Sequence, residues 1–320
     1  MRNNLRPASN EIAIASPFAV RSLSRAIIAM TAIGGLAACS ADQNITSSAR
    51  QQKPQETVAS APAFVYVSDS SGVNQLWQYS GGTSSRLTFS NSVDKDPHSA
   101  AGHLVFASYR DGDEEIYMGR NDLSGLKRLT TTAGEDEQPN LSPDASRIAF
   151  VSYRSGTPRI WVMDSTGANQ TALETGSESY VPESAPSWSP NGSQLVYTST
   201  RSGMSQVFVI SAAGGTPVQL THEMNGAFNP VWSVDGSQIV YVSVMGTPSL
   251  SAVTVATGET SDWVYDGAGI GQPSCTSAGC IAVEGAYGSN GSIVSIGQDL
   301  STTILVDTPA NETSPTLLVH

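Results

Sequence analysis

Four acidic residues occupy the same place in four repeated segments and are the first candidates for chemistry. Each stands three residues before a proline: Asp94, Asp136, Glu183 and Glu312. On strands that surround a common axis, they would ring one mouth of a central channel, with gaps at Ala227 and Ile270. Carboxylates bind hard cations and basic side chains, so the ring is a candidate site for a metal ion or a basic segment of a partner protein. The alternative, which the recurrence favours, is that each carboxylate accepts hydrogen bonds from turn N–H groups.

Two cysteines suggest a different chemistry. Cys275 and Cys280 stand on either side of a predicted hairpin, and Cys275 takes the place that Trp188 and Trp232 hold in the preceding repeats. In an oxidising compartment the pair can form a disulfide across the hairpin, which would contribute about 2 kcal/mol by the chain-entropy model. A metal half-site is the alternative, but no second cysteine pair and no nearby histidine accompanies it. We predict the disulfide.

The other reactive residues form no catalytic pattern. The acidic run 111–115 lacks the spacing of an EF-hand loop, and the four histidines are scattered over the chain. No nucleophile elbow, P-loop or dinucleotide fingerprint occurs. We expect no enzymatic activity, no cofactor and no bound metal.

An internal repeat defines the elements that must position these residues. Segments 136–173 and 183–221 share an opening proline, an apolar second strand and a Ser-x-Arg-x-Gly turn. The intervals between opening prolines are 42 to 47 residues, the length of a four-stranded propeller blade. These prolines are Pro97, Pro139, Pro186, Pro230, Pro273 and Pro315.

The two ends of the repeat region complement each other. The first unit begins at its second strand, 64–68, whereas the last segment, 315–319, is a proline strand with no unit after it. If the last strand completes the first blade, two exposed sheet edges disappear. The sequence therefore predicts an all-β protein, a six-bladed β-propeller with four-stranded blades closed by the C-terminal strand.

Composition narrows the range of partners. Of 16 basic and 28 acidic residues, four basic residues and one acidic residue precede Cys39, so the remainder carries 12 basic and 27 acidic groups, a net charge of −15. Such a surface repels nucleic acid. We expect a monomer that binds no nucleic acid.

The N-terminal segment has the features of an export signal. Arg21 and Arg25 precede an eleven-residue apolar run, 26–36, which is too short to span a membrane. The run leads into Leu-Ala-Ala-Cys at 36–39, which resembles the lipobox of bacterial lipoproteins and implies lipid attachment at Cys39. We predict a signal peptide over 1–38, a flexible tether over 39–62 and the propeller over 63–320. By the sorting rule of that class, Ser40 at the next position implies the outer membrane, facing the periplasm or the cell surface.

The repeats themselves resemble those of TolB-type propellers, on the opening prolines, the Asn-Gly and Asp-Gly turns and the Leu-Thr pairs at 87–88, 129–130 and 220–221. The resemblance implies a non-enzymatic envelope lipoprotein whose propeller is a scaffold for binding a protein or peptide, with membrane attachment through the lipid. TolB itself carries an additional N-terminal domain, which this sequence does not show, so TolB's own role is not assigned. The alternative is a propeller enzyme that acts on envelope or extracellular polysaccharide at a channel-mouth site.

Overall fold

The computed structural model describes residues 61–176, 180–244, 246–263, 269–276, 279–285, 290–297 and 301–319. The predicted signal peptide, Cys39 and residues 39–60 of the predicted tether lie outside the described residues. Within the described ranges no helix is long and apolar enough to cross a membrane.

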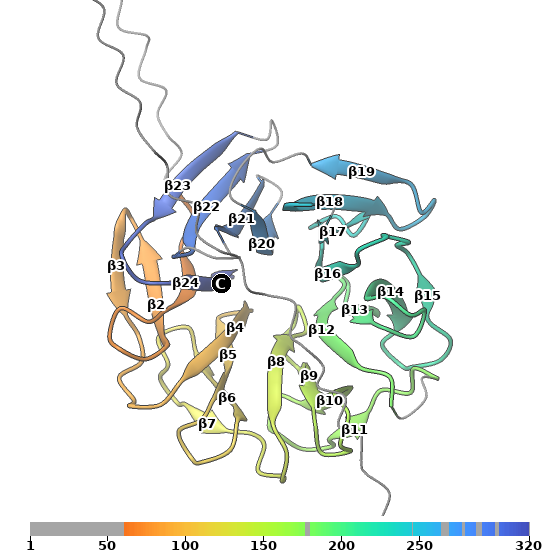
Figure 1. The fold of residues 1–320 in the computed structure, drawn as a ribbon. Helices are drawn as coiled ribbons and strands as arrows, with labels where there is room; N and C mark the ends of the chain where they lie inside the picture. The colour runs from red at the N-terminus through yellow and green to blue at the C-terminus, as the bar shows by residue number, and fades with distance from the viewer. Residues whose placement is uncertain are drawn as a thin grey trace, which may run out of the picture. The chain divides into compact units, whose positions relative to one another are not determined.

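The described strands form six antiparallel sheets of four strands, arranged as blades around a centre (Figure 1). Blade one contains β24 (Glu312–Leu317), β1 (Phe64–Ser68), β2 (Gln75–Ser80) and β3 (Thr83–Arg86). Blade two contains β4 (Asp94–Ala100), β5 (His103–Ser108), β6 (Glu115–Arg120) and β7 (Lys127–Arg128). Blade three contains β8 (Asp136–Leu141), β9 (Arg147–Ser152), β10 (Arg159–Asp164) and β11 (Thr171–Ala172).

The other three blades repeat this order from the inner to the outer strand. Blade four contains β12 (Glu183–Trp188), β13 (Gln194–Ser199), β14 (Gln206–Ser211) and β15 (Val218–Gln219). Blade five contains β16 (Ala227–Trp232), β17 (Gln238–Val244), β18 (Pro248–Thr254) and β19 (Thr260–Trp263). Blade six contains β20 (Ile270–Thr276), β21 (Gly279–Glu284), β22 (Ser292–Gly297) and β23 (Thr302–Val306).

The C-terminal strand closes the ring in the predicted way. β24 pairs antiparallel with β1, with Leu317 opposite Phe64 and Glu312 opposite Ser68. Because β24 also contacts the inner strands of blades six and two, the six inner strands form a continuous ring. The predicted fold is confirmed, including the blade count and the closure.

Apolar side chains hold the ring together between the blades. The second and third strands of each blade carry most of the buried apolar residues, and each of six core clusters combines residues from two neighbouring blades. Phe64 and Tyr66 of blade one, for example, pack with Ile281 and Val283 of blade six. Since no blade has a core of its own, burial depends on a completed ring.

The outer strands are shorter than the repeats suggest. β7 and β15 contain two residues each and end just before the Leu-Thr pairs. The threonine hydroxyl takes over from the backbone there: Thr130 Oγ1 accepts a hydrogen bond from the N–H of Ile116 at 2.9 Å, and Thr221 Oγ1 accepts one from Val207 at 2.9 Å. The Leu-Thr pair therefore marks the end of the outer strand in blades one, two and four.

Candidate functional site

A central cavity of about 510 Å³ lies where the six inner strands meet. All six strands contribute to its wall, which includes the six opening prolines. Residues of the first hairpins, such as Pro143, Pro190 and Val234, also line it, so the cavity lies toward the ends of the inner strands. A volume of this size is in the range of binding pockets for small molecules or a short peptide segment.

A bulge in each inner strand shapes the cavity wall. The pairing register of all six inner strands shifts at the proline, which has no N–H to donate to the ladder. The residue before each proline has a positive φ of 48° to 51°, which residues other than glycine rarely adopt. These six residues all line the cavity: Asp96, Gln138, Ala185, Asn229, Gln272 and Ser314.

Side chains of the wall also connect one blade to the next. Gln138 Oε1 accepts a hydrogen bond from the N–H of Ala185 at 2.7 Å, and Gln272 Oε1 accepts one from Ser314 at 2.8 Å. Behind the proline, Asn140 Oδ1 accepts one from the N–H of Trp188 at 3.1 Å. The wall is therefore preorganised by the same bonds that hold the ring closed.

The cavity wall carries little charge. Asp96 is its one acidic residue, and His98 is its one histidine among the described residues. Burial lowers the pKa of His98 to about 4, so its imidazole is neutral at pH 7. The imidazole Nδ1 accepts a hydrogen bond from the N–H of Leu141 at 3.1 Å. The rest of the wall consists of prolines, amides, hydroxyls and two tryptophans. Such a wall suits a peptide segment that is uncharged, or that carries both polar and apolar groups, better than an ion.

The four repeated acids lie elsewhere. Asp94, Asp136, Glu183 and Glu312 each open an inner strand, but their side chains are fully buried and none lines the cavity. The carboxylates meet donors inside the protein instead: Asp94 and Asp136 pair with arginines of their own blades. Glu183 also accepts hydrogen bonds from Arg159 Nε and the Ile160 N–H of blade three, both at 3.2 Å. Their use as binding groups stays a prediction.

Arginines of the Ser-x-Arg-x-Gly turns neutralise three of these carboxylates. Arg154 Nη2 lies 2.8 Å from Asp136 Oδ2, and the guanidinium stacks over the rings of Phe150 and Trp161 at 5.5 and 4.4 Å. Arg110 contacts Asp94 at 2.9 Å in the same manner. The acid and the arginine were visible in the sequence as separate repeat features, but their pairing was missed because it joins the first strand to the turn after the second.

One acidic cluster stands near the cavity, between blades two and three. Asp96, Glu114 and Glu137 are close enough to share a cation, and the Lys95 ammonium fills that place, 2.9 Å from the carboxylates of both Glu114 and Glu137. Burial raises the pKa of Glu114 to about 7, against the lowering effect of Lys95. The lysine makes this cluster an internal ion pair.

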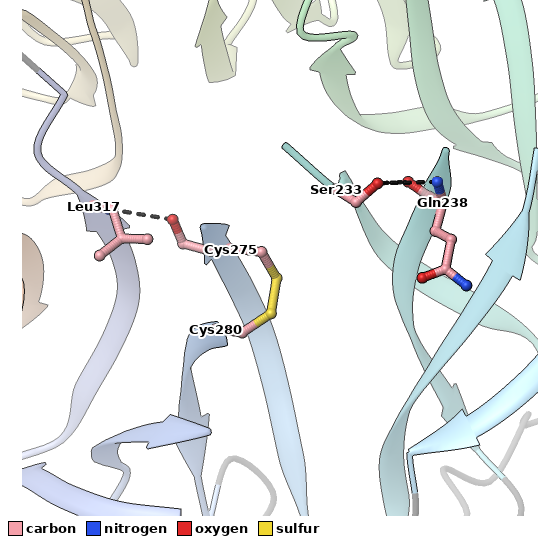
Figure 2. The surroundings of a disulfide bond; sticks show 6 residues. Ser233, Gln238, Cys275, Cys280 and Leu317 are labelled. Carbon is pink, nitrogen blue, oxygen red and sulfur yellow. Dashed lines mark hydrogen bonds between the residues drawn. A yellow bond between two sulfur atoms is a disulfide. The ribbon is translucent and has the colours of Figure 1, made fainter. Parts of the chain in front are cut away.

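A disulfide lies at the rim of the cavity. Cys275 of β20 and Cys280 of β21 are opposite each other in the strand register and are joined by a disulfide (Figure 2). Figure 2 shows the pair between Leu317 of β24 and the turn from Ser233 to Gln238. Cys275 packs against the core shared by blades five and six, where blades four and five present tryptophans to their own neighbours.

Comparisons with known sequences point to one group of proteins. The family model of the TolB beta propeller domain matches residues 178–318. A protein TolB homolog of Chlorobium luteolum is 39% identical over 61 residues, 19% of this chain and 14% of the relative. The Tol-Pal system protein TolB of Roseobacter denitrificans is 39% identical over 54 residues, 17% of this chain and 12% of that protein. The matched segments thus span less than a fifth of either relative.

Solved structures show the same fold. TolB from Acinetobacter baumannii has a TM-score of 0.70 at 17% identity, over 81% of this chain and 67% of that one. A putative TolB from Agrobacterium tumefaciens has a TM-score of 0.64 at 16% identity, over 81% and 94%. A puromycin-hydrolyzing peptidase of Mycobacterium tuberculosis has a TM-score of 0.55 at 13% identity, over 72% of this chain and 42% of that one, so the fold alone does not decide catalysis. The chain is a β-propeller, and its residues 178–318 match the TolB beta propeller domain.

Proposed function

We propose that the chain is a non-enzymatic lipoprotein of the cell envelope whose propeller binds a segment of a partner protein in its central cavity. The observation that carries the proposal is the cavity itself. Its wall is formed by all six inner strands, fixed by blade-to-blade hydrogen bonds, and made of prolines, amides, hydroxyls and tryptophans with a single carboxylate. Uncharged polar groups beside apolar surface suit a polypeptide, whose backbone and side chains need both.

The comparisons support a protein partner in the envelope. One relative is named for the Tol-Pal system, and the repeats are of the TolB type. Attachment at Cys39 to the outer membrane would place the propeller at the periplasm or the cell surface, where the disulfide between Cys275 and Cys280 is stable.

Site-specific photo-crosslinking in intact cells tests the binding site. A photoreactive phenylalanine at Val234, on the cavity rim and 52% exposed, should crosslink one discrete partner. The same group at Val218, 59% exposed on the outer strand β15, is the matched control and should not capture it.

A substitution that fills the cavity completes the test. Val231→Trp places a large ring into the cavity and should abolish the Val234 crosslink, whereas Val218→Trp should leave it unchanged. Thermal unfolding of both variants verifies that they fold. A crosslink that persists in folded Val231→Trp would refute binding in the cavity.

A further inference from the structure

Three blades contain the same guanidinium pocket. In blades two, three and four the third residue of the Ser-x-Arg-x-Gly turn is an arginine that lies 2.8 to 3.2 Å from the buried acid of the inner strand. The guanidinium also lies over two aromatic rings of the second and third strands, 4.4 to 5.8 Å from their centroids. The arginines are Arg110, Arg154 and Arg201.

Blades five and six have lost both partners together. Ala227 and Ile270 take the place of the acid, and in the sequence Met245 and Ala286 take the place of the arginine. Joint loss is expected, because a buried carboxylate without a cation is costly.

In blade one the acid is retained although the arginine is absent. It keeps the acid, Glu312, but has Ser70 where the arginine stands in blades two to four. The turn is otherwise the same: the Ser70 N–H donates to Ser68 Oγ at 3.2 Å and the Gly72 N–H to the Asp69 carbonyl at 2.7 Å, as in the arginine-bearing turns.

Only one of the two oxygens of the Glu312 carboxylate has hydrogen-bond partners. Its Oε1 accepts hydrogen bonds from the hydroxyls of Thr308, at 2.5 Å, and Ser68, at 3.4 Å, but its fully buried Oε2 has no hydrogen-bond partner. In blade two, Ser90 stands four residues before Asp94 as Thr308 stands before Glu312, and its hydroxyl takes one carboxylate oxygen while Arg110 takes the other. Glu312 Oε2 is thus the atom that a guanidinium would contact.

The aromatic part of the pocket is also retained in blade one. Tyr66 of β1 is opposite Trp77 of β2, the same register that Phe106 and Tyr117 hold beneath Arg110. The surroundings are negative as well: Asp69 and Asp307 lie near enough to Glu312 to add to the effect of burial in raising its pKa. No lysine or arginine of the described residues forms an ion pair with it.

We propose that Glu312, Tyr66 and Trp77 form a binding site for the guanidinium group of an arginine supplied by another polypeptide chain. Ser70 is exposed, and its short side chain does not extend to the place that the turn arginine holds in blades two to four. The site lies within blade one and does not depend on the central cavity.

Titration of the full chain with L-arginine amide tests the proposal, with uncharged L-citrulline amide as the matched probe. The NMR signal of the Trp77 indole N–H, assigned with Trp77→Phe, reports binding. Arginine amide should shift this signal in a saturable way, and citrulline amide should bind at least tenfold more weakly. Equal binding of the two probes would refute a guanidinium site, as would a Trp77 shift with calcium chloride and none with arginine amide.

Two serine variants on the same turn supply the decisive control. Ser70→Arg provides the guanidinium from within the chain, so it should abolish binding of arginine amide and raise the unfolding temperature. Ser71→Arg adds the same charge one residue away and should retain binding within a factor of two or three. Wild-type binding by Ser70→Arg, or equal loss in both variants, overturns the proposal. Val231→Trp, which fills the central cavity, should bind arginine amide normally, so the two proposals fail separately.

Discussion

Removing the guanidinium from blade three should destabilise the propeller strongly. Asp136 is fully buried, and Arg154, whose side chain is 13% exposed, is its one cationic partner among the described ion pairs. Arg154→Met keeps an apolar stem over Phe150 and Trp161 but leaves the carboxylate uncompensated. Breaking a buried ion pair in this way costs about 3–5 kcal/mol of unfolding free energy.

The double variant separates the lost charge pair from lost packing. Blade five already shows the apolar solution in the sequence, with Ala227 for the acid and Met245 for the arginine. Asp136→Ala combined with Arg154→Met should therefore be more stable than Arg154→Met alone, because no unpaired charge remains. Asp136→Ala by itself should cost about 1–3 kcal/mol, since Arg154 keeps its hydrogen bond to Gln170 at 2.8 Å.

Urea unfolding at pH 7, followed by tryptophan fluorescence, measures these differences at constant m-value. The loss in Arg154→Met should shrink toward pH 5, because burial raises the pKa of Asp136 and the neutral acid is tolerated without a cation. A loss below about 1 kcal/mol at pH 7 would refute the reasoning, as would a double variant that loses the sum of the two single losses.

Three further predictions concern other parts of the chain. Cys39→Ser should move the protein from the membrane to the soluble fraction, and retention in the membrane would contradict lipid attachment. Deletion of 311–320 removes β24 and leaves β1 an open edge, so circular dichroism should show loss of cooperative unfolding; a stability equal to that of the full chain would contradict closure. Burial raises the pKa of Glu114 from 4.5 to about 7, so the folded state binds more protons and stability should fall as pH rises between these values. Glu114→Gln should make the decrease in unfolding free energy over this pH range smaller by roughly 3 kcal/mol. If the pH profile of urea unfolding is unchanged in this variant, Glu114 is not the cause of the decrease.

The propeller could be predicted because its blades are repeated units of similar length in the sequence. Six prolines at blade-length intervals indicate six inner strands, and the unpaired strands at 64–68 and 315–319 indicate how the ring closes. The cysteines at 275 and 280 are another local signal, because strands joined by a tight turn place such residues opposite each other. Each of these inferences depends on spacing alone.

The binding surfaces were less accessible from the sequence. The repeats predicted that the acids face a channel, yet the bulge at each proline places the residue before the proline, such as Gln138, on the cavity wall. Asp136 instead pairs with Arg154, whose guanidinium lies over two aromatic rings of the same blade. A one-residue shift in a strand changes the face on which side chains lie, and spacing does not reveal such shifts.

The sequence by itself determined the repeat length, the six blades and the closing strand, because hydrophobic periodicity and turn residues act locally. Only the tertiary structure decided which polar groups meet, because Glu312, Arg154 and Lys95 each have a partner on another strand or blade. It also showed that Glu312, alone among the four repeated acids, forms no ion pair with an arginine of the described residues. Burial and three-dimensional contact, which set the cost of an unpaired charge, appear only when the ring is closed.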